Sequence, residues 1–232
     1  MNRFLFFFAI ALTLAGCGTA MSTQARPDAY YDSSVSESSE ASLFSGDAET
    51  LSDEAIGSIL AYQYEAPPLS RIALMPFGRE AWSSWSEEFA LASAKMQAEV
   101  LHRLQASPKI YDASYLPSIL VPQSRTVPHL REAAARYQAD LLLVYRSNCQ
   151  SFEKYRLFGA DTSRAYCAIE AVLLDTRTGL VPFTTVASRS YDVTRNSADT
   201  NFRETMMRAQ LDATAEAMGD VSTEIVQFLA DK

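Results

Sequence analysis

The pattern of hydrophobic and polar positions divides the chain into an apolar start, a long polar stretch and a series of strand-like and helix-like segments. Residues 4–14 are almost wholly apolar, whereas residues 18–50 are rich in serine, threonine and acidic residues. Only from about residue 67 do apolar residues recur often enough to form a core. We therefore predict a lipoprotein signal peptide over residues 1–16, a tether over residues 17–66 and a globular domain over residues 67–232.

The predicted domain opens with two strand–helix repeats. Residues 71–77 form a continuous apolar run, typical of a strand buried on both faces. Residues 109–113 are expected to form the second strand. Both helices are predicted from apolar residues at three- and four-residue spacing. The first stripe, which follows the capping Ser86, is Trp85, Phe89, Ala92, Met96, Val100 and Leu104, and the second is Val127, Leu130, Ala134 and Tyr137.

Three strands and a long helix are expected to complete the domain. Residues 141–145, 166–174 and 180–193 have extended patterns, and Gly179 lies in a hairpin turn between the last two. From about Asp199 helical spacing continues to the end of the chain. The order βαβαβββα predicts a mixed α+β fold, in which helices pack on one mixed sheet of about five strands. The helical stripe consists of Phe202, Met206, Ala213, Ala217, Val221, Ile225 and Phe228.

The tether is expected to be a flexible acidic coil with one short helix near its end. Residues 22–65 contain nine acidic residues against Arg26 alone, too many charges and too few apolar groups for a core. Residues 51–64 can form a helix capped by Ser52, with Ile56, Ile59 and Leu60 along one side. A coil of about 50 residues spans roughly 40 Å on average.

The amino terminus predicts where the protein works. The apolar run is shorter than the about 20 residues needed to span a bilayer and ends in Leu14-Ala15-Gly16-Cys17, a lipobox. We expect Cys17 to become the first residue and to carry acyl chains such as palmitate, which anchor the protein to a membrane. Gly18, rather than an aspartate, follows the cysteine and favours sorting to the outer membrane, with the domain facing the periplasm. The alternative is an ordinary signal peptide with an incidental cysteine.

Charge and motif content argue against several functional classes. The formal net charge of −8 lies almost entirely in the tether, so the domain has no basic field to attract nucleic acid. Only His102 and His129 are available, on different predicted helices, and no phosphate loop or paired metal-ligand spacing occurs. We therefore predict no enzyme activity, no cofactor and no metal site.

Four motifs in order resemble one superfamily. They are residues 71–77, residues 109–120 with their Lys-Ile-Tyr-Asp start, residues 139–144 and residues 173–179. Together they look like the landmarks of the superfamily of the curli-secretion lipoprotein, the lipoprotein activators of penicillin-binding proteins and the amino-terminal domain of the translocation protein TolB. Rhombotarget lipoproteins are a narrower possibility. The resemblance implies a non-enzymatic periplasmic adaptor, and the absence of long paired hairpin insertions disfavours a pore.

We thus expect a lipid-anchored periplasmic binding or adaptor module that regulates or scaffolds an envelope protein, with a cell-wall synthase as the partner suggested by the resemblance. The alternatives are a structural subunit of an outer-membrane secretion or surface-assembly complex, which includes a homo-oligomer, and a small-ligand binder. Aromatic residues in loops often anchor interfaces. The candidates for partner contacts are Trp82, Tyr155 and Phe158, whereas Trp85 and Phe152 also suit core positions.

The two cysteines that remain besides Cys17 are expected to form a disulfide. If the strand from Leu141 pairs antiparallel with the strand that ends at Asp175, the numbers of opposite residues add up to 316, as those of Cys149 and Cys167 do. Directly opposite residues lie close enough for a bridge, and the periplasm is oxidising. A register slip of one residue would turn the two side chains to opposite faces. The alternative is a pair of buried, reduced thiols.

Overall fold

The structure is a computed structural model, which describes residues 42–43, 51–78, 86–154, 162–194 and 202–232. The chain divides into two compact units, residues 1–40 and residues 41–232, and every described residue belongs to the second. Its helices and strands are α3 (Asp53–Ala61), β1 (Ser70–Pro76), α4 (Glu87–Gln105), β2 (Ile110–Tyr115), the 3₁₀ turn η2 (Ser118–Leu120), α5 (Val127–Arg136), β3 (Leu141–Lys154), β4 (Thr162–Asp175), β5 (Phe183–Thr194) and α6 (Phe202–Ala230).

The strands form one mixed five-stranded sheet in the order β2-β1-β3-β4-β5. β1 is parallel to both β2 and β3. Parallel strands need a crossover connection, which α4 provides between β1 and β2 and α5 between β2 and β3. The strands β3, β4 and β5 form an antiparallel meander. The predicted fold class, a mixed α+β domain with helices packed on one sheet, is confirmed.

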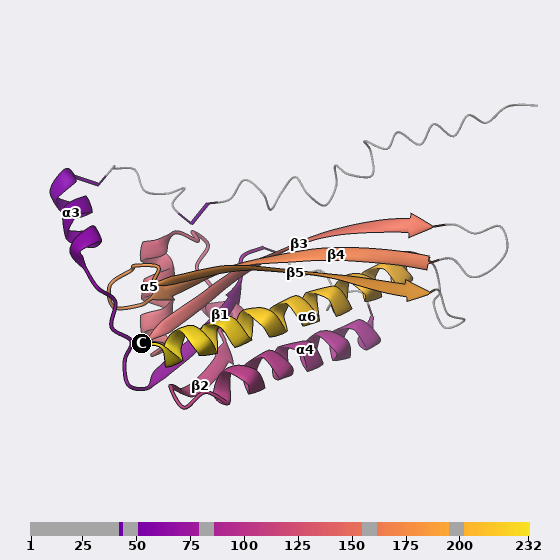
Figure 1. The fold of residues 1–232 in the computed structure, drawn as a ribbon, viewed down its shortest axis with the longest axis horizontal. Coiled ribbons are helices and arrows are strands. Elements are labelled where there is room, and N and C mark those ends of the chain that lie inside the picture. Colours follow the sequence, from indigo (N-terminus) through magenta and orange to yellow (C-terminus); the bar gives the residue numbers. More distant parts are fainter. Residues whose placement is uncertain (1–41, 44–50, 79–85, 155–161, 195–201) are drawn as a thin grey trace, which may run out of the picture. The chain divides into compact units, whose positions relative to one another are not determined.

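Helices cover both faces of the sheet around its central strands. In β1, Ile72 and Leu74 face one cluster of buried residues, whereas Ala73 and Met75 face another. This explains the continuous apolar run, because a strand covered on both faces has no solvent-facing positions. The helices α4 and α6 lie on the first face and α5 on the second (Figure 1). The helical contributors are Val100, Leu104, Ala217, Met218, Val221, Ile225 and Leu229 on the first face, and Val127, Leu130, Ala133 and Ala134 on the second.

The hairpin of β3 and β4 is longer than the sequence predicts. The apolar pattern of β3 ends at Tyr145, but the strand continues to Lys154 and pairs with β4 without a register shift. We call the outer part of the meander the arm; it consists of β3 from Arg146 onward and of the residues of β4 and β5 that pair with it, up to Glu170 and from Val186. The helix α6 has 29 residues and runs along the arm, with α4 beside it (Figure 1). Ion pairing between Arg189 of β5 and Asp220 of α6, 2.7 Å apart, joins helix and sheet.

The turn between β4 and β5 has the chemistry expected of it. The Asp175 carboxylate accepts hydrogen bonds from the amide and the hydroxyl of Thr178, at 2.8 and 2.5 Å. Gly179 has φ +78°, a backbone conformation that favours glycine. Arg131 of α5 donates to the carbonyl oxygens of Thr176 and Arg177, so hydrogen bonds also connect the turn to α5.

The structure describes residues 42–43 and 51–66 of the predicted tether. Ser52 caps α3 by accepting from the amide of Ala55 at 3.2 Å, as predicted, but no side chain of this helix is buried. Its apolar side chains Ile56, Ile59 and Leu60 are exposed. Leu43 packs against the buried cluster on the α5 face of the sheet. None of the helices in the described ranges is long and apolar enough to cross a membrane.

Candidate binding surface

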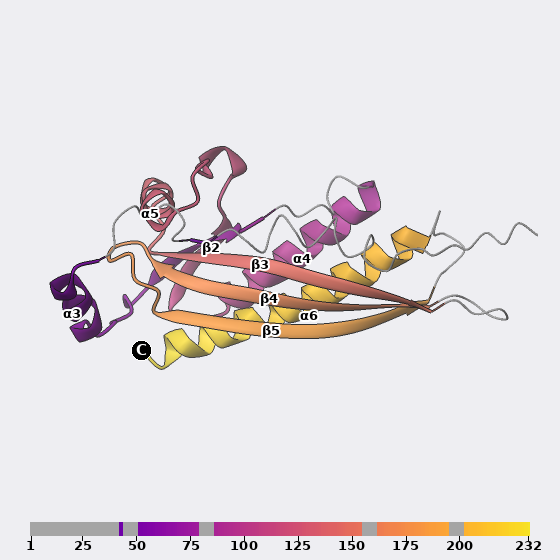
Figure 2. The ribbon, with the colours of Figure 1, turned by 90° about the horizontal axis from the view of Figure 1, so that it is seen from above.

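The two faces of the arm differ because side chains alternate along each strand. Directly opposite residues share a face, so the registers of the two hairpins assign each position to one side. One face is covered by α6. The other extends beyond α5, and Figure 2 shows no described helix in front of it. We call this the open face; it consists of Arg146, Asn148, Gln150 and Phe152 of β3, Arg164, Tyr166, Ala168 and Glu170 of β4, and Val186, Ser188, Ser190 and Asp192 of β5.

Three large apolar side chains are exposed on the open face. Phe152 is 50% exposed, Tyr166 44% and Val186 69%. Each comes from a different strand, and polar residues such as Gln150 separate them. A surface that alternates aromatic and polar groups is typical of the part of a protein that contacts another protein.

The charges of the open face neutralise one another. Arg164 donates two hydrogen bonds to the Asp192 carboxylate, at 2.6 and 2.7 Å, and Arg146 donates to Glu170 at 2.5 Å. The hydrogen bonds from Arg164 lower the pKa of Asp192, and the same contact raises the pKa of Arg164. Both pairs join neighbouring strands, so they fix the surface without giving it a net charge.

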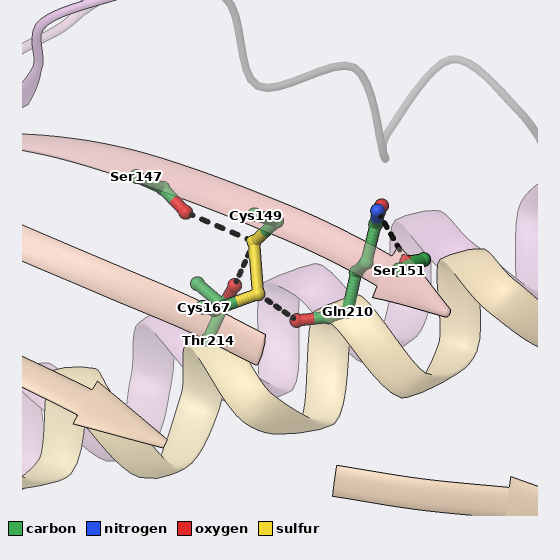
Figure 3. Close-up of a disulfide and its surroundings, with 6 residues drawn as sticks. All are labelled: Ser147, Cys149, Ser151, Cys167, Gln210 and Thr214. Carbon is green, nitrogen blue, oxygen red and sulfur yellow. Dashed lines mark hydrogen bonds between the residues drawn. A yellow bond between two sulfur atoms is a disulfide. The ribbon is translucent and has the colours of Figure 1, made fainter. Parts of the chain in front are cut away.

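The covered face of the arm carries the disulfide between Cys149 and Cys167. The two residues are partners in the β3–β4 register, as predicted. Their sulfurs lie against α6 (Figure 3), where the side chain of Thr214 and the backbone of Gln210 approach them. Cys167 is fully buried. The bridge therefore lies between the sheet and its covering helix.

Polar groups around the disulfide fit an oxidised pair. A bridged sulfur carries no hydrogen and can only accept, so the hydroxyls of Ser147 and Thr214 act as donors to the Cys149 Sγ, both at 3.5 Å. The 3.4 Å approach of Cys167 Sγ to the Gln210 carbonyl is then a contact rather than a hydrogen bond. The Gln210 side chain donates to the Ser151 hydroxyl at 2.8 Å, a second link between α6 and the arm.

Several residues predicted from the sequence lie outside the described residues. They are Cys17, Trp82, Trp85, Tyr155 and Phe158. Phe152, for which a core position was the alternative, is on the open face instead. His102 is exposed on α4, and His129 contacts the hydroxyl of Thr126 at 2.8 Å through its Nδ1. Within the described parts of the chain, no three His, Cys, Asp or Glu residues are grouped so that they could hold a metal ion.

Tyr166 and Val186 were not singled out by the sequence analysis. A signal was available for Tyr166, because the register that pairs the cysteines also makes Tyr166 the partner of Gln150, one position away from the bridge. Adjacent positions on a strand point to opposite faces. Tyr166 must therefore lie on the face opposite the disulfide, as it does.

Comparison with known proteins finds solved structures that match this chain at low similarity. No family model and no curated protein matches the sequence. The hypothetical protein CT253 from Chlamydia trachomatis is 12% identical, with a TM-score of 0.41, over 71% of this chain and 99% of that one. Lipoprotein GNA1162 from Neisseria meningitidis is 14% identical, with a TM-score of 0.32, over 71% and 100%. A minor lipoprotein from Acinetobacter baumannii is 8% identical, with a TM-score of 0.32, over 71% and 94%. The superfamily resemblance stays a prediction.

Proposed function

We propose that the protein is a lipid-anchored module that binds another protein of the bacterial cell envelope through the open face of its arm. The observation that carries this proposal is the exposure of Phe152, Tyr166 and Val186 on a sheet face that no described element covers. The lipobox at Cys17 supports membrane attachment. Gly18, which follows Cys17 in place of an aspartate, favours sorting to the outer membrane, with the domain in the periplasm.

The chemistry of the open face favours a protein partner over a nucleic acid or a lipid surface. The two arginines of the open face, as we have defined it, are paired with carboxylates of the neighbouring strand, so these side chains offer no excess of positive charge to phosphate groups. Tyr166 and Phe152 are rigid aromatic side chains, which lose little conformational entropy on binding. We expect a partner with apolar pockets and a polar, nearly neutral rim.

The role of the complex is regulation or scaffolding rather than catalysis. The sequence lacks the motifs of the common enzyme classes. The superfamily resemblance suggests a cell-wall synthase as the partner. The alternative is a structural subunit of an outer-membrane secretion or surface-assembly complex, in which the open face contacts another copy of this chain or a secretion component.

Photo-crosslinking in intact cells tests the proposal. A crosslinking amino acid at Gln150, an exposed position beside Tyr166, is expected to capture one envelope protein, whose identity separates the synthase from the secretion complex. The variant Tyr166→Ala should reduce this capture about tenfold or more, as expected for an aromatic anchor. Tyr111→Ala is a matched control, because Tyr111 is a 60% exposed tyrosine on the distant strand β2.

Two outcomes would contradict this assignment. Equal capture by wild type, Tyr166→Ala and Tyr111→Ala would show that the open face does not bind the partner. A loss of capture together with a large fall in melting temperature would assign Tyr166 to packing of the arm. Capture of a second copy of the chain alone would favour the alternative function.

A further inference from the structure

The predicted tether contacts the domain at Leu43. The carbonyl oxygen of Leu43 accepts a hydrogen bond of 3.2 Å from the amide of Val127, the first residue of α5. The Leu43 side chain is half-buried and packs against the cluster formed by α5 and the sheet. A segment far from the domain in sequence thus gives α5 both an apolar contact and a hydrogen-bond acceptor.

The start of α5 lacks the usual source of such an acceptor. Its N-cap residue, Thr126, makes no capping hydrogen bond, because its hydroxyl is engaged with His129 Nδ1. Pro128 has no amide hydrogen, and the amide of Leu130 is bonded to the Thr126 carbonyl. The Val127 amide is therefore a donor that needs a partner from outside the helix, and Val127 itself is only 8% exposed.

We propose that Leu43 is a built-in docking residue that pins the tether to the first turn of α5. The site accepts one apolar side chain together with the backbone carbonyl of the same residue. Its occupant is residues 42–43 of this chain. The pin makes Leu43, instead of Tyr64, the first described residue of the tether that packs against a core cluster.

The membrane part of this inference rests on the proposed function, because it assumes acyl chains on Cys17. The positions of Leu43 and Cys17 differ by 26 residues. A chain reaches at most about 3.5 Å per residue, so these 26 residues reach at most about 90 Å, against about 160 Å for the 47 residues from Cys17 to Tyr64, which packs against the cluster on the other face of the sheet. Docking of Leu43 therefore lowers the greatest distance that the domain can reach from an acyl chain on Cys17.

Amide exchange in the full chain, followed by NMR, tests the pin without reference to lipidation. In Leu43→Ser the Val127 amide should exchange about tenfold faster, the change expected when one hydrogen bond is lost. Leu51→Ser is the matched control, since Leu51 is a 60% exposed leucine of the same polar region. Exchange at Val127 that is equal in the wild type and both variants would overturn the proposal.

Amides of β3 and β4 report whether the Leu43 variant still folds. They should keep their wild-type exchange rates, because Leu43 lies at the edge of its cluster. If they also exchange faster, the milder Leu43→Ala variant is measured in the same way. An acceleration at Val127 that never exceeds the one in β3 and β4 would assign Leu43 to general stability and overturn the pin.

Energy transfer on vesicles tests the consequence for reach. A dye on Ala135→Cys, an exposed position of α5, is paired with an acceptor lipid in phosphatidylcholine vesicles that carry the lipidated protein. Transfer should fall in Leu43→Ser and stay unchanged in Leu51→Ser. Equal transfer in all three would overturn the effect on reach. A protein that does not bind the vesicles at all would contradict lipidation, and hence the proposed function, while the exchange result at Val127 would still decide the pin.

Discussion

Cys149 and Cys167 face each other across β3 and β4, with their Cα atoms 4.2 Å apart and their sulfurs joined. This separation is close to the shorter of the two spacings found in antiparallel ladders. The bridge fixes the pairing of the two strands in the arm, where β3 has no large apolar side chain on the covered face to help specify the register. The disulfide and the two cross-strand ion pairs thus hold the arm in one register.

The first prediction concerns the stability that the bridge provides. Replacing both cysteines by alanine should lower the free energy of unfolding by about 3 kcal/mol, because the bridge closes a loop of 18 residues in the unfolded chain. Urea unfolding of the periplasmically expressed domain measures the change. Alkylation of the folded wild type without reductant should leave both cysteines unmodified, and two alkylated thiols would contradict the disulfide.

The second prediction concerns the anchor. Replacing Cys17 by serine should release the protein from the membrane, because the acyl chains supply nearly all membrane affinity and the acidic tether is repelled by anionic lipid. Detergent-phase partitioning measures the release. The double Cys149/Cys167 alanine variant serves as a control that should still partition with detergent. Full membrane association of Cys17→Ser would show that the lipobox assignment is wrong.

The third prediction concerns the turn at Gly179. Replacing this residue by alanine should destabilise the protein by about 1–3 kcal/mol, since φ +78° is strained for other residues. An added Cβ would also lie 2.8 Å from the Arg131 side chain, which would have to move. Gly57→Ala is the matched control: Gly57 lies in the exposed helix α3 with open space around it, and alanine favours helices. Equal melting temperatures for the two variants would contradict this role.

The fourth prediction concerns the pH dependence contributed by Asp212. Burial in α6 raises the pKa of this carboxyl, Arg208 opposes the shift and Glu216 adds to it. The folded state therefore favours the neutral acid, and its stabilising contribution is present below the ordinary pKa and lost as the pH rises through the raised value. Asp212→Asn should then unfold at a higher temperature than wild type at pH 7, with a smaller difference near pH 3. A difference that grows on acidification would contradict the shift.

Much of the fold was predictable because its central strands are covered on both faces. Residues 72–77 are all apolar, so the sequence predicts both that this run is a strand and that the strand is buried on both faces. The helix α4 was similarly clear, since Phe89, Met96 and Val100 keep one face apolar. The cysteine pairing could be predicted from one assumed pair of opposite residues, Leu141 and Asp175. Once one pair is known, an antiparallel register fixes all other partners.

The arm was harder to predict because hydrophobic periodicity is weak there. Ser147 and Ser151 occupy the covered face of β3, so this side of the strand lacks large apolar residues beyond Tyr145. On the open face, polar groups such as Asn148 and Gln150 precede Phe152. A pattern without an apolar stripe gives no strand signal, and the extent of β3 became evident only through its partner strand.

Successive side chains of a strand point to opposite faces of the sheet. The length of the arm can therefore change only if its strands gain or lose residues together and in even numbers. One residue inserted in β3 before Cys149 would move that cysteine to the open face and break the bridge. Insertion of two residues in each strand preserves the faces and lengthens the arm by about 6.7 Å. A helix needs four to five residues, at about 1.5 Å each, to match this distance. Viable length variants of this protein should therefore change β3, β4 and β5 by two residues each and α6 by slightly more than one turn.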